Sequence, residues 1–133
     1  MRFCDLEVGM SGSIVREFSE QDVRLFSELS GDNNPIHLDE CVAAKSKFGR
    51  RIVHGALVSS LFSAIFGAHI PGAGAIYVYQ DVRFVKPVFL GSKVKASVEL
   101  AAMDHARNRV HFDCVCHVDG EKVAEGKAVL IVP

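Results

Sequence analysis

The chain has 133 residues, of which 49% are hydrophobic and 23% charged. This length suits one domain with a substantial buried core, and the composition is ordinary for a globular protein. The 15 lysines and arginines nearly balance 16 aspartates and glutamates, so the charge gives no support to a nucleic-acid or anionic-membrane partner. We therefore expect a single domain over residues 1–133, with no nucleic-acid and no membrane partner.

The sequence favours a reducing compartment. Residues 1–7 contain no apolar segment of the kind that secretory signals carry, and the most apolar stretch, Gly55–Ala68, is too short to span a bilayer. The four cysteines lack the density of a disulfide scaffold, and Cys114 and Cys116 share one face of a predicted strand, where core packing is expected. A cytoplasmic location is predicted, with the mitochondrial matrix as the alternative in a eukaryote.

The chain begins with a predicted strand over Ser11–Phe18. Behind it, Ser19 followed by Asp22 is typical of a helix N-cap. The apolar residues that recur at helical spacing after this cap are Val23, Phe26 and Leu29. We expect this helix to end near Gly31.

A loop over Asp32–Leu38 and a second short helix capped by Asp39 are predicted next. The stretch Val53–Ile70 then has apolar or small residues on every face and no Asp, Glu, Lys or Arg. A helix of this kind must be surrounded by protein or lipid, and its length excludes lipid. We therefore expect protein to surround this helix, which should end before Pro71.

From Gly74 onward the pattern is typical of strands, with many Val, Ile, Phe and Tyr residues. The four predicted strands cover Ala75–Val85, Lys93–Ala101, Arg109–Val118 and Lys122–Val132. Turn residues separate them, and Asp119-Gly120 is a strong signal for a two-residue hairpin. The sequence predicts an α+β fold in which a four-stranded antiparallel meander, joined by the early strand, wraps around the central apolar helix. This architecture is the hotdog fold.

The loop that contains Asp32 and His37 carries the clearest chemical signal. The two residues are five apart, which on a helix would place them about 140° from each other. Pro35 disfavours a helical conformation at Asn34, so a folded-back loop can bring the carboxylate and the imidazole together. A water held between them would meet a base and a proton donor, as hydration of a double bond requires. On spacing alone, an ordinary turn with a capping aspartate and an unremarkable histidine is the alternative.

A second feature is His54-Gly55 at the start of the apolar helix. Free N–H groups at a helix N-terminus attract negative charge, and glycine lets a ligand approach the main chain. A thioester carbonyl placed there would be stabilised as in an oxyanion hole. Gly55, Ser59 and Ser63 are spaced by four and form either a groove for an acyl chain or a tightly packed face. His54 itself either packs at the helix start or contacts substrate.

The chain contains GDNNPIHLD at residues 31–39, VHG at residues 53–55 and FVKPV at residues 84–88. In this order and at these intervals, the motifs resemble those of the MaoC-like (R)-specific enoyl-CoA hydratases and 3-hydroxyacyl-thioester dehydratases. The resemblance extends from Phe26 to Gly91, with no departure at a catalytic position. It implies a hydratase/dehydratase, a carbon–oxygen lyase, in fatty-acid or polyhydroxyalkanoate metabolism.

The resemblance also implies roles for individual residues. Asp32 and His37 would be the catalytic pair, which adds water to a trans-2-enoyl thioester and gives an (R)-3-hydroxyacyl thioester. Asn34 would support the loop, the Gly55 amide would bind the thioester carbonyl, and Ser63 would lie beside the pair. No metal and no separate cofactor are implied, because CoA or the phosphopantetheine of acyl carrier protein belongs to the substrate. The implied partners are acyl-CoA or acyl-carrier-protein substrates and a second copy of the chain.

Two other functions are compatible with a hotdog fold. A hotdog thioesterase would direct water at the thioester carbonyl, and the Asp32 to His37 motif argues against it. A non-catalytic module that binds acyl carriers would bind acyl thioesters tightly without turnover.

Overall fold

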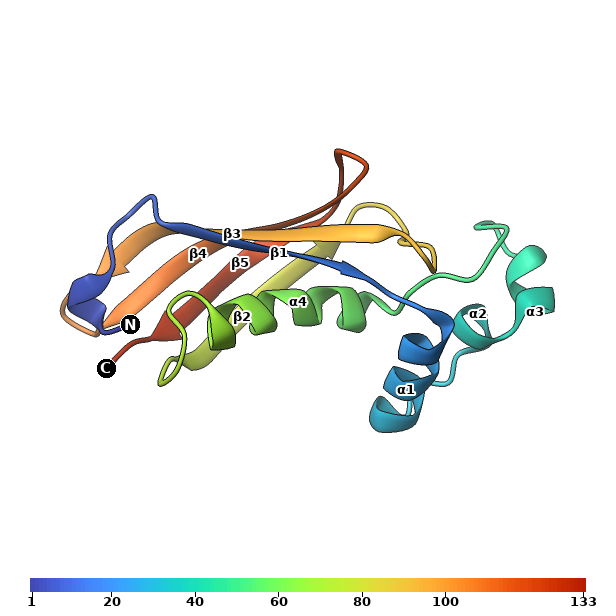
Figure 1. Cartoon of the computed structure of the whole chain (residues 1–133), viewed down its shortest axis with the longest axis horizontal. Coiled ribbons are helices and arrows are strands. Elements are labelled where there is room, and N and C mark those ends of the chain that lie inside the picture. The colour runs from blue at the N-terminus through green and yellow to red at the C-terminus, as the bar shows by residue number, and fades with distance from the viewer.

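The computed structural model describes residues 1–133 and consists of a five-stranded antiparallel sheet packed on one long helix (Figure 1). The strands are β1 (Ser11–Glu17), β2 (Ile76–Phe84), β3 (Lys93–Asp104), β4 (Arg109–Val118) and β5 (Glu121–Ile131). The α-helices are α1 (Glu20–Ser30), α2 (Pro35–Leu38), α3 (Glu40–Ala44) and α4 (Gly55–Ala68), and a short 3-10 helix, η1, covers Phe3–Asp5. The predicted α+β architecture, a sheet around a central apolar helix, is confirmed.

The strand order differs from a simple meander. The sheet has the order β1-β3-β4-β5-β2, so β2 lies at the edge beside β5 and does not pair with β3. Val82 of β2, for example, faces Gly126 of β5. The predicted four-stranded meander is therefore wrong for its first strand, whereas β3, β4 and β5 do follow one another and β1 joins at β3. Consecutive strands usually pair, but here β4 and β5 lie between β3 and β2 in the sheet.

Local signals set the ends of the elements as expected. The Ser19 side chain accepts a hydrogen bond from the Asp22 N–H at 3.2 Å, and the Asp22 carboxylate accepts one from the Ser19 N–H at 2.8 Å, which forms a capping box. Gly31 ends α1 with a φ of 82°. Between β4 and β5, Asp119 and Gly120 both have positive φ, as a two-residue hairpin turn requires.

Helix α4 buries its apolar residues against the sheet. Its buried side chains are Val58, Leu61, Phe62, Ile65 and Phe66, which belong to one core cluster of 24 buried residues. The opposite face consists of small residues, including Ser60, Ser63 and Gly67, and is exposed in the single chain. No helix of the structure combines the length and the apolar character needed to cross a membrane.

The cysteines behave as the strand pattern predicts. Cys114 and Cys116 are buried free thiols on the core face of β4, and Cys4 and Cys41 are exposed free thiols. Burial raises the pKa of both Cys114 and Cys116 to about 12, so both remain protonated packing residues.

The short helices place the candidate site at one end of the molecule. Helices α1, α2 and α3 lie together beyond one end of the sheet, and the chain enters α4 from that side (Figure 1). The loop between α1 and α2 therefore lies next to the N-terminus of α4.

Candidate active site

The segment that contains Asp32 and His37 is half loop and half helix. Asn34 is the N-cap of α2, and its Oδ1 accepts a hydrogen bond from the Ile36 N–H at 3.3 Å. Pro35 occupies the first helical position, where its missing N–H leaves no helical bond unmade. The predicted loop over Asp32–Leu38 is therefore wrong from Pro35 onward, because an Asn-Pro pair can start a helix as well as bend a loop.

Asp32 is fixed by its backbone and leaves its side chain exposed. Its N–H donates to Ser30 Oγ at 3.1 Å, and the Ser30 hydroxyl donates to the Phe26 carbonyl oxygen at 2.7 Å. One carboxylate oxygen, Oδ1, accepts from the Asn34 N–H at 3.2 Å. The other carboxylate oxygen forms no hydrogen bond within the chain and can accept one from a water or a substrate.

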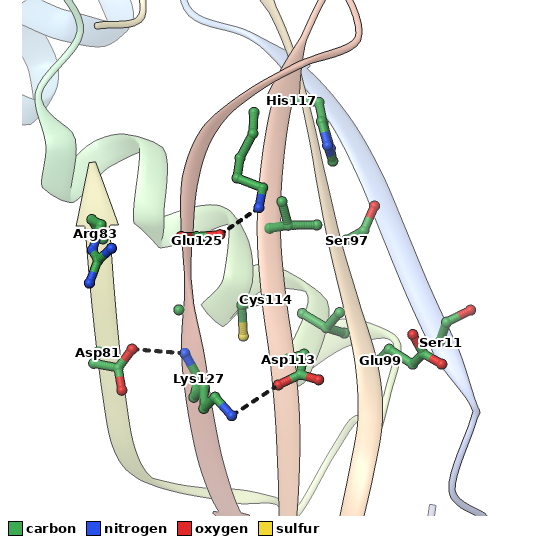
Figure 2. Close-up of a pocket in the computed structure, with 14 residues that line it drawn as sticks. Ser11, Asp81, Arg83, Ser97, Glu99, Asp113, Cys114, His117, Glu125 and Lys127 are labelled. Atoms are coloured by element: carbon green, nitrogen blue, oxygen red, sulfur yellow. Dashed lines mark hydrogen bonds and ion pairs between the residues drawn. The ribbon is translucent and has the colours of Figure 1, made fainter. Parts of the chain in front are cut away.

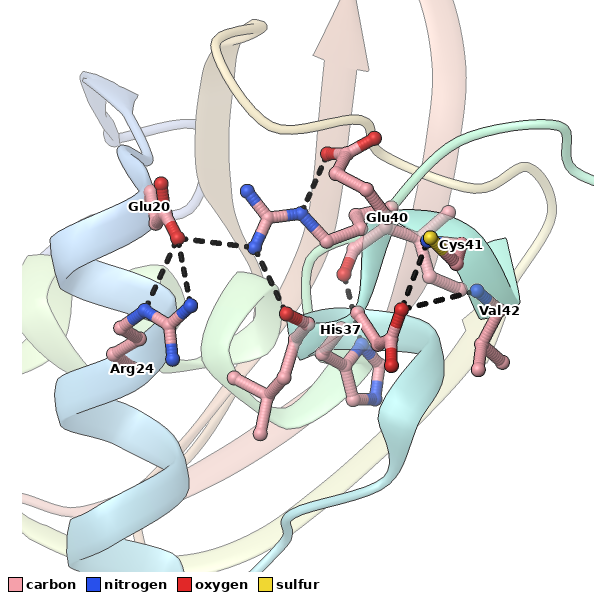
Figure 3. Close-up of polar contacts among 10 residues, drawn as sticks. Glu20, Arg24, His37, Glu40, Cys41 and Val42 are labelled. Carbon is pink, nitrogen blue, oxygen red and sulfur yellow. Dashed lines mark hydrogen bonds and ion pairs between the residues drawn. The ribbon is translucent and has the colours of Figure 1, made fainter. Parts of the chain in front are cut away.

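His37 is nearly buried and has a defined tautomer. Its Nδ1 lies 2.8 Å from the Ile52 carbonyl oxygen (Figure 3), and a carbonyl can only accept, so Nδ1 carries the proton. Nε2 of the neutral ring is then unprotonated and forms no hydrogen bond. It keeps contact with solvent, because the only buried side-chain nitrogen or oxygen without a partner is Nδ1 of His54. His37 can therefore accept a proton at Nε2 and donate it again.

The structure brings the predicted pair together. One carboxylate oxygen of Asp32 and one ring nitrogen each of His37 and His54 lie within 4.8 Å of one another. A single water about 2.8 Å from each of two such atoms can bridge that gap. Carboxylate and imidazole are also metal ligands, but the two rings are stacked nearly in parallel, so their in-plane lone pairs do not converge on one ion. The arrangement therefore suits a water held by an acid–base pair.

His54 lies directly behind this pair and is 1% exposed. Its Nε2 is 3.1 Å from the Asp32 carbonyl oxygen and 3.0 Å from Ser27 Oγ, and its ring stacks on that of His37 at a centroid distance of 3.8 Å. Desolvation lowers the pKa of His54, so the ring is neutral. Its unpaired Nδ1 costs about 1–3 kcal/mol of stability. From the sequence, His54 either packs at the helix start or contacts substrate. The structure instead places it against both predicted catalytic residues.

Gly55 is the first residue of α4, and no side chain caps this helix end. The first N–H groups of the helix therefore remain open to a ligand. A methyl group at Gly55 would lie 2.9 Å from the Phe84 ring, which is too close for two carbon atoms in contact. Glycine at this position lets Phe84 of β2 pack directly on the start of the helix.

The two remaining predicted residues lie farther from the chemistry or have structural roles. Ser63 is eight residues beyond Gly55, about 12 Å along the helix axis, and its exposed hydroxyl forms no hydrogen bond. The Asn34 side chain is engaged as the cap of α2, which supports the turn behind Asp32. Contact of either residue with a substrate stays a prediction.

An ion-pair network that the sequence did not indicate anchors the helices around the site. Arg51 is 8% exposed, and its guanidinium donates to Glu40 at 2.8 Å, Glu20 at 3.2 Å and the Leu38 carbonyl oxygen at 3.3 Å (Figure 3). These partners belong to α3, α1 and α2. Arg51 therefore links the three helices that hold His37 in place, and its hydrogen bond lowers the pKa of Glu20.

A hollow of about 750 Å³ lies elsewhere, on the solvent-facing side of the sheet (Figure 2). Two ion pairs lie in it, Lys127–Asp113 at 3.7 Å and Lys122–Glu125 at 2.6 Å, and neither Asp32 nor His37 lines it. A smaller hollow of about 330 Å³ lies beside the Asp32 loop and includes Gly31 and Asn33. We assign the site to the Asp32–His37 pair because only there do open acid–base groups meet an uncapped helix end.

Comparisons with known proteins place the chain in one family. Residues 7–122 match the family described as MaoC like domain. The chain is 44% identical over 131 residues to a 3-hydroxybutyryl-CoA dehydratase of Methylorubrum extorquens, an alignment that covers 98% of this chain and 83% of that protein. It is 46% identical over 129 residues to an (R)-specific enoyl-CoA hydratase of Aeromonas caviae, which covers 96% of both.

The fold has a close counterpart among solved structures. The structure of an (R)-hydratase from A. caviae involved in PHA biosynthesis matches with a TM-score of 0.94 at 39% identity. The match covers 96% of this chain and 98% of that one. The predicted hotdog fold is thereby confirmed.

Proposed function

Since this chain belongs to the MaoC-like dehydratase family, we propose that it is an enzyme that reversibly hydrates trans-2-enoyl-CoA thioesters to (R)-3-hydroxyacyl-CoA thioesters. The observation that carries this proposal is the approach of Asp32 and His37, whose carboxylate oxygen and ring nitrogen lie within 4.8 Å. CoA is the carrier in the names of both relatives, which favours it over acyl carrier protein.

In the proposed reaction, a water sits between Asp32 and His37. Asp32 accepts a proton from the water as its oxygen bonds to C3, and the electron pair of the C2–C3 double bond moves toward the thioester oxygen. Asp32 passes this proton to the unprotonated Nε2 of His37, and the resulting imidazolium donates it to C2. Both groups thereby return to their starting states, and the reverse sequence gives dehydration.

The start of α4 supplies the second part of the proposed site. The open Gly55 N–H donates to the thioester oxygen, where negative charge develops as C3 is attacked. Asn34 keeps the Asp32 turn in place by capping α2. Ser63, on the exposed face of α4, borders the acyl chain.

We further propose that the active form is a homodimer joined along β2. This strand ends the sheet, so one of its edges has no partner. Its apolar side chains are exposed by 40–53%, and they include Ile76, Tyr77, Val78 and Tyr79. A second copy there would also cover the exposed small-residue face of α4. Sedimentation should give twice the chain mass for wild type and for Val8→Lys, an exposed control position, and the monomer mass for Ile76→Lys.

A cytoplasmic location fits the exposed free thiols of Cys4 and Cys41, which a reducing compartment preserves. The mitochondrial matrix satisfies the same condition in a eukaryote.

Crotonyl-CoA separates the proposed function from its rivals. Loss of the conjugated absorbance without release of free thiol, with an (R)-3-hydroxy product, is the expected result. Thiol release would instead identify a thioesterase. Tight binding without any chemical change would identify a non-catalytic module.

A further inference from the structure

One buried polar side chain at this site has no part in the reaction as proposed. His54 is 1% exposed, contacts Asp32 through its carbonyl oxygen and stacks on the ring of His37. It thus touches both members of the catalytic pair: its Nε2 lies 3.1 Å from the Asp32 carbonyl oxygen, and its ring centroid lies 3.8 Å from that of His37. Asp32 and His37 are also the titratable groups that face it.

The hydrogen bond to Asp32 fixes the protonation state of His54. The Asp32 carbonyl can only accept, so His54 Nε2 carries a proton. A second proton on Nδ1 would leave a buried N–H without an acceptor, next to a His37 ring that becomes cationic during the reaction. His54 is therefore a neutral ring with its hydrogen on Nε2, whereas neutral His37 carries its hydrogen on Nδ1.

We propose, on the basis of the proposed function, that His54 is a positioning residue that couples the two catalytic groups. Its Nε2–H holds the carbonyl of Asp32, and its ring forms a flat support against which the His37 imidazole rests. A displacement of either group would therefore be transmitted to the other. His54 stays neutral so that it does not repel His37 when that ring takes up a proton.

Packing alone does not account for a histidine here. A phenyl ring has a similar flat shape and would leave no unpaired nitrogen in the core, whereas His54 leaves Nδ1 without a partner. The property that a phenyl ring lacks is the donor to Asp32. The unpaired Nδ1 is thus the consequence of placing a donor and a stacking surface in one side chain.

Three variants test the role of the donor. His54→Phe keeps the stacked ring and removes the donor, and His54→Gln restores an N–H near the position of Nε2. Ser27→Ala is the matched control, since it removes the other polar contact of the same nitrogen. We expect kcat to fall about 10-fold or more in His54→Phe with KM changed less than about twofold, because misplaced catalytic groups lose rate rather than affinity. His54→Gln should recover part of the loss, and Ser27→Ala should remain within about threefold of wild type.

The outcomes distinguish this inference from the proposed function. If wild type hydrates crotonyl-CoA and His54→Phe has the same kcat, the positioning role is refuted while the function stands. If wild type does not hydrate enoyl thioesters at all, the function itself fails. Unfolding curves of each variant show whether a fall in kcat comes from loss of the folded structure. Recovery of kcat in His54→Gln would show that it does not.

A spectroscopic measurement on wild type needs no variant. Nitrogen NMR of the imidazoles should show His54 protonated at Nε2 and unprotonated at Nδ1 from about pH 7 to about pH 8, above the ordinary pKa of a histidine. A protonated Nδ1 on His54 in that range would overturn the proposal.

Discussion

The imidazoles of His54 and His37 lie face to face, 3.8 Å apart at their centroids and inclined by 26°. Each ring donates to a backbone carbonyl through a different nitrogen, His37 to Ile52 and His54 to Asp32. The main chain thereby selects both tautomers. Only Nε2 of His37 remains unbonded and open to solvent among the four ring nitrogens, so a proton can enter the pair at one defined atom.

The neutral His54 makes stability depend on pH. Burial holds the pKa of His54 below its ordinary value of 6.5 in the folded chain, so the unfolded chain binds a proton on His54 at a higher pH than the folded chain does. Stability should therefore fall as the pH drops through about 6.5 toward the lowered pKa, and level off below it. Urea unfolding at about pH 7.5, 6.5 and 5.5 measures this slope.

The control for this prediction is His54→Gln, which carries no titratable group at that position. Carboxylates such as Glu20 and Glu121 titrate in both proteins, so their contribution cancels in the comparison. The slope should be smaller in the variant. Equal slopes would mean that His54 is not held neutral by the fold.

Gly55 tests the thioester-binding end of the site. A methyl group there meets the Phe84 ring at 2.9 Å, and that ring is 53% exposed and can move outward. The free energy of unfolding of Gly55→Ala should therefore fall by at most about 1–3 kcal/mol, the usual cost of overpacking. We expect the kcat/KM of Gly55→Ala to fall by more than this loss of stability explains, since the methyl group blocks the open amide.

The double variant Gly55→Ala/Phe84→Ala separates these two effects. Removing the ring relieves its contact with the methyl group. The double variant should therefore lose less free energy of unfolding than the sum of the losses measured for Gly55→Ala and Phe84→Ala separately. Hydration of crotonyl-CoA should stay low. Recovery of full activity in the double variant would show that the Phe84 contact, and not ligand access to the amide, is the reason for glycine.

Arg51 and Arg24 offer a matched pair for the helix network. Both bind Glu20, but Arg51 is nearly buried whereas the Arg24 side chain is 55% exposed. Arg51→Met should lower the free energy of unfolding by about 1–3 kcal/mol, because the Leu38 carbonyl and Glu40 lose their shared donor. Arg24→Met should change it by less than about 0.5 kcal/mol. Equal effects in chemical denaturation would contradict the anchoring role of Arg51.

The sequence predicts the elements of this fold well and their arrangement less well. Strand and helix periodicities, the Ser19 cap and the Asp119-Gly120 turn are local properties, and the structure confirms them. The position of β2 beside β5 is not local. It depends on how α4 crosses the sheet, and no alternation of side chains encodes which neighbour a strand pairs with.

The same distinction applies to the site. Asp32 and His37 could be found from their motif, and the structure brings them together as expected. The motif includes His54, but its role could not be predicted from the sequence, because its contacts come from α1, the Asp32 loop and α2. Arg51 follows Lys45, Lys47 and Arg50 closely in the sequence and nothing local singles it out, because its partners Glu20 and Glu40 lie 31 and 11 residues away.

The central claim is that Asp32 and His37 act on one water, and Asp32→Asn tests it most directly. Asparagine keeps an oxygen for the Asn34 N–H, and the side chain is exposed, so the fold should be unchanged. The matched control is Glu28→Gln, which neutralises another exposed carboxylate on the neighbouring helix α1. With crotonyl-CoA, we predict that kcat falls about 100-fold or more in Asp32→Asn, the scale of a positioned acid–base group, and stays at the wild-type value in Glu28→Gln. Equal kcat values for Asp32→Asn and wild type would contradict the mechanism.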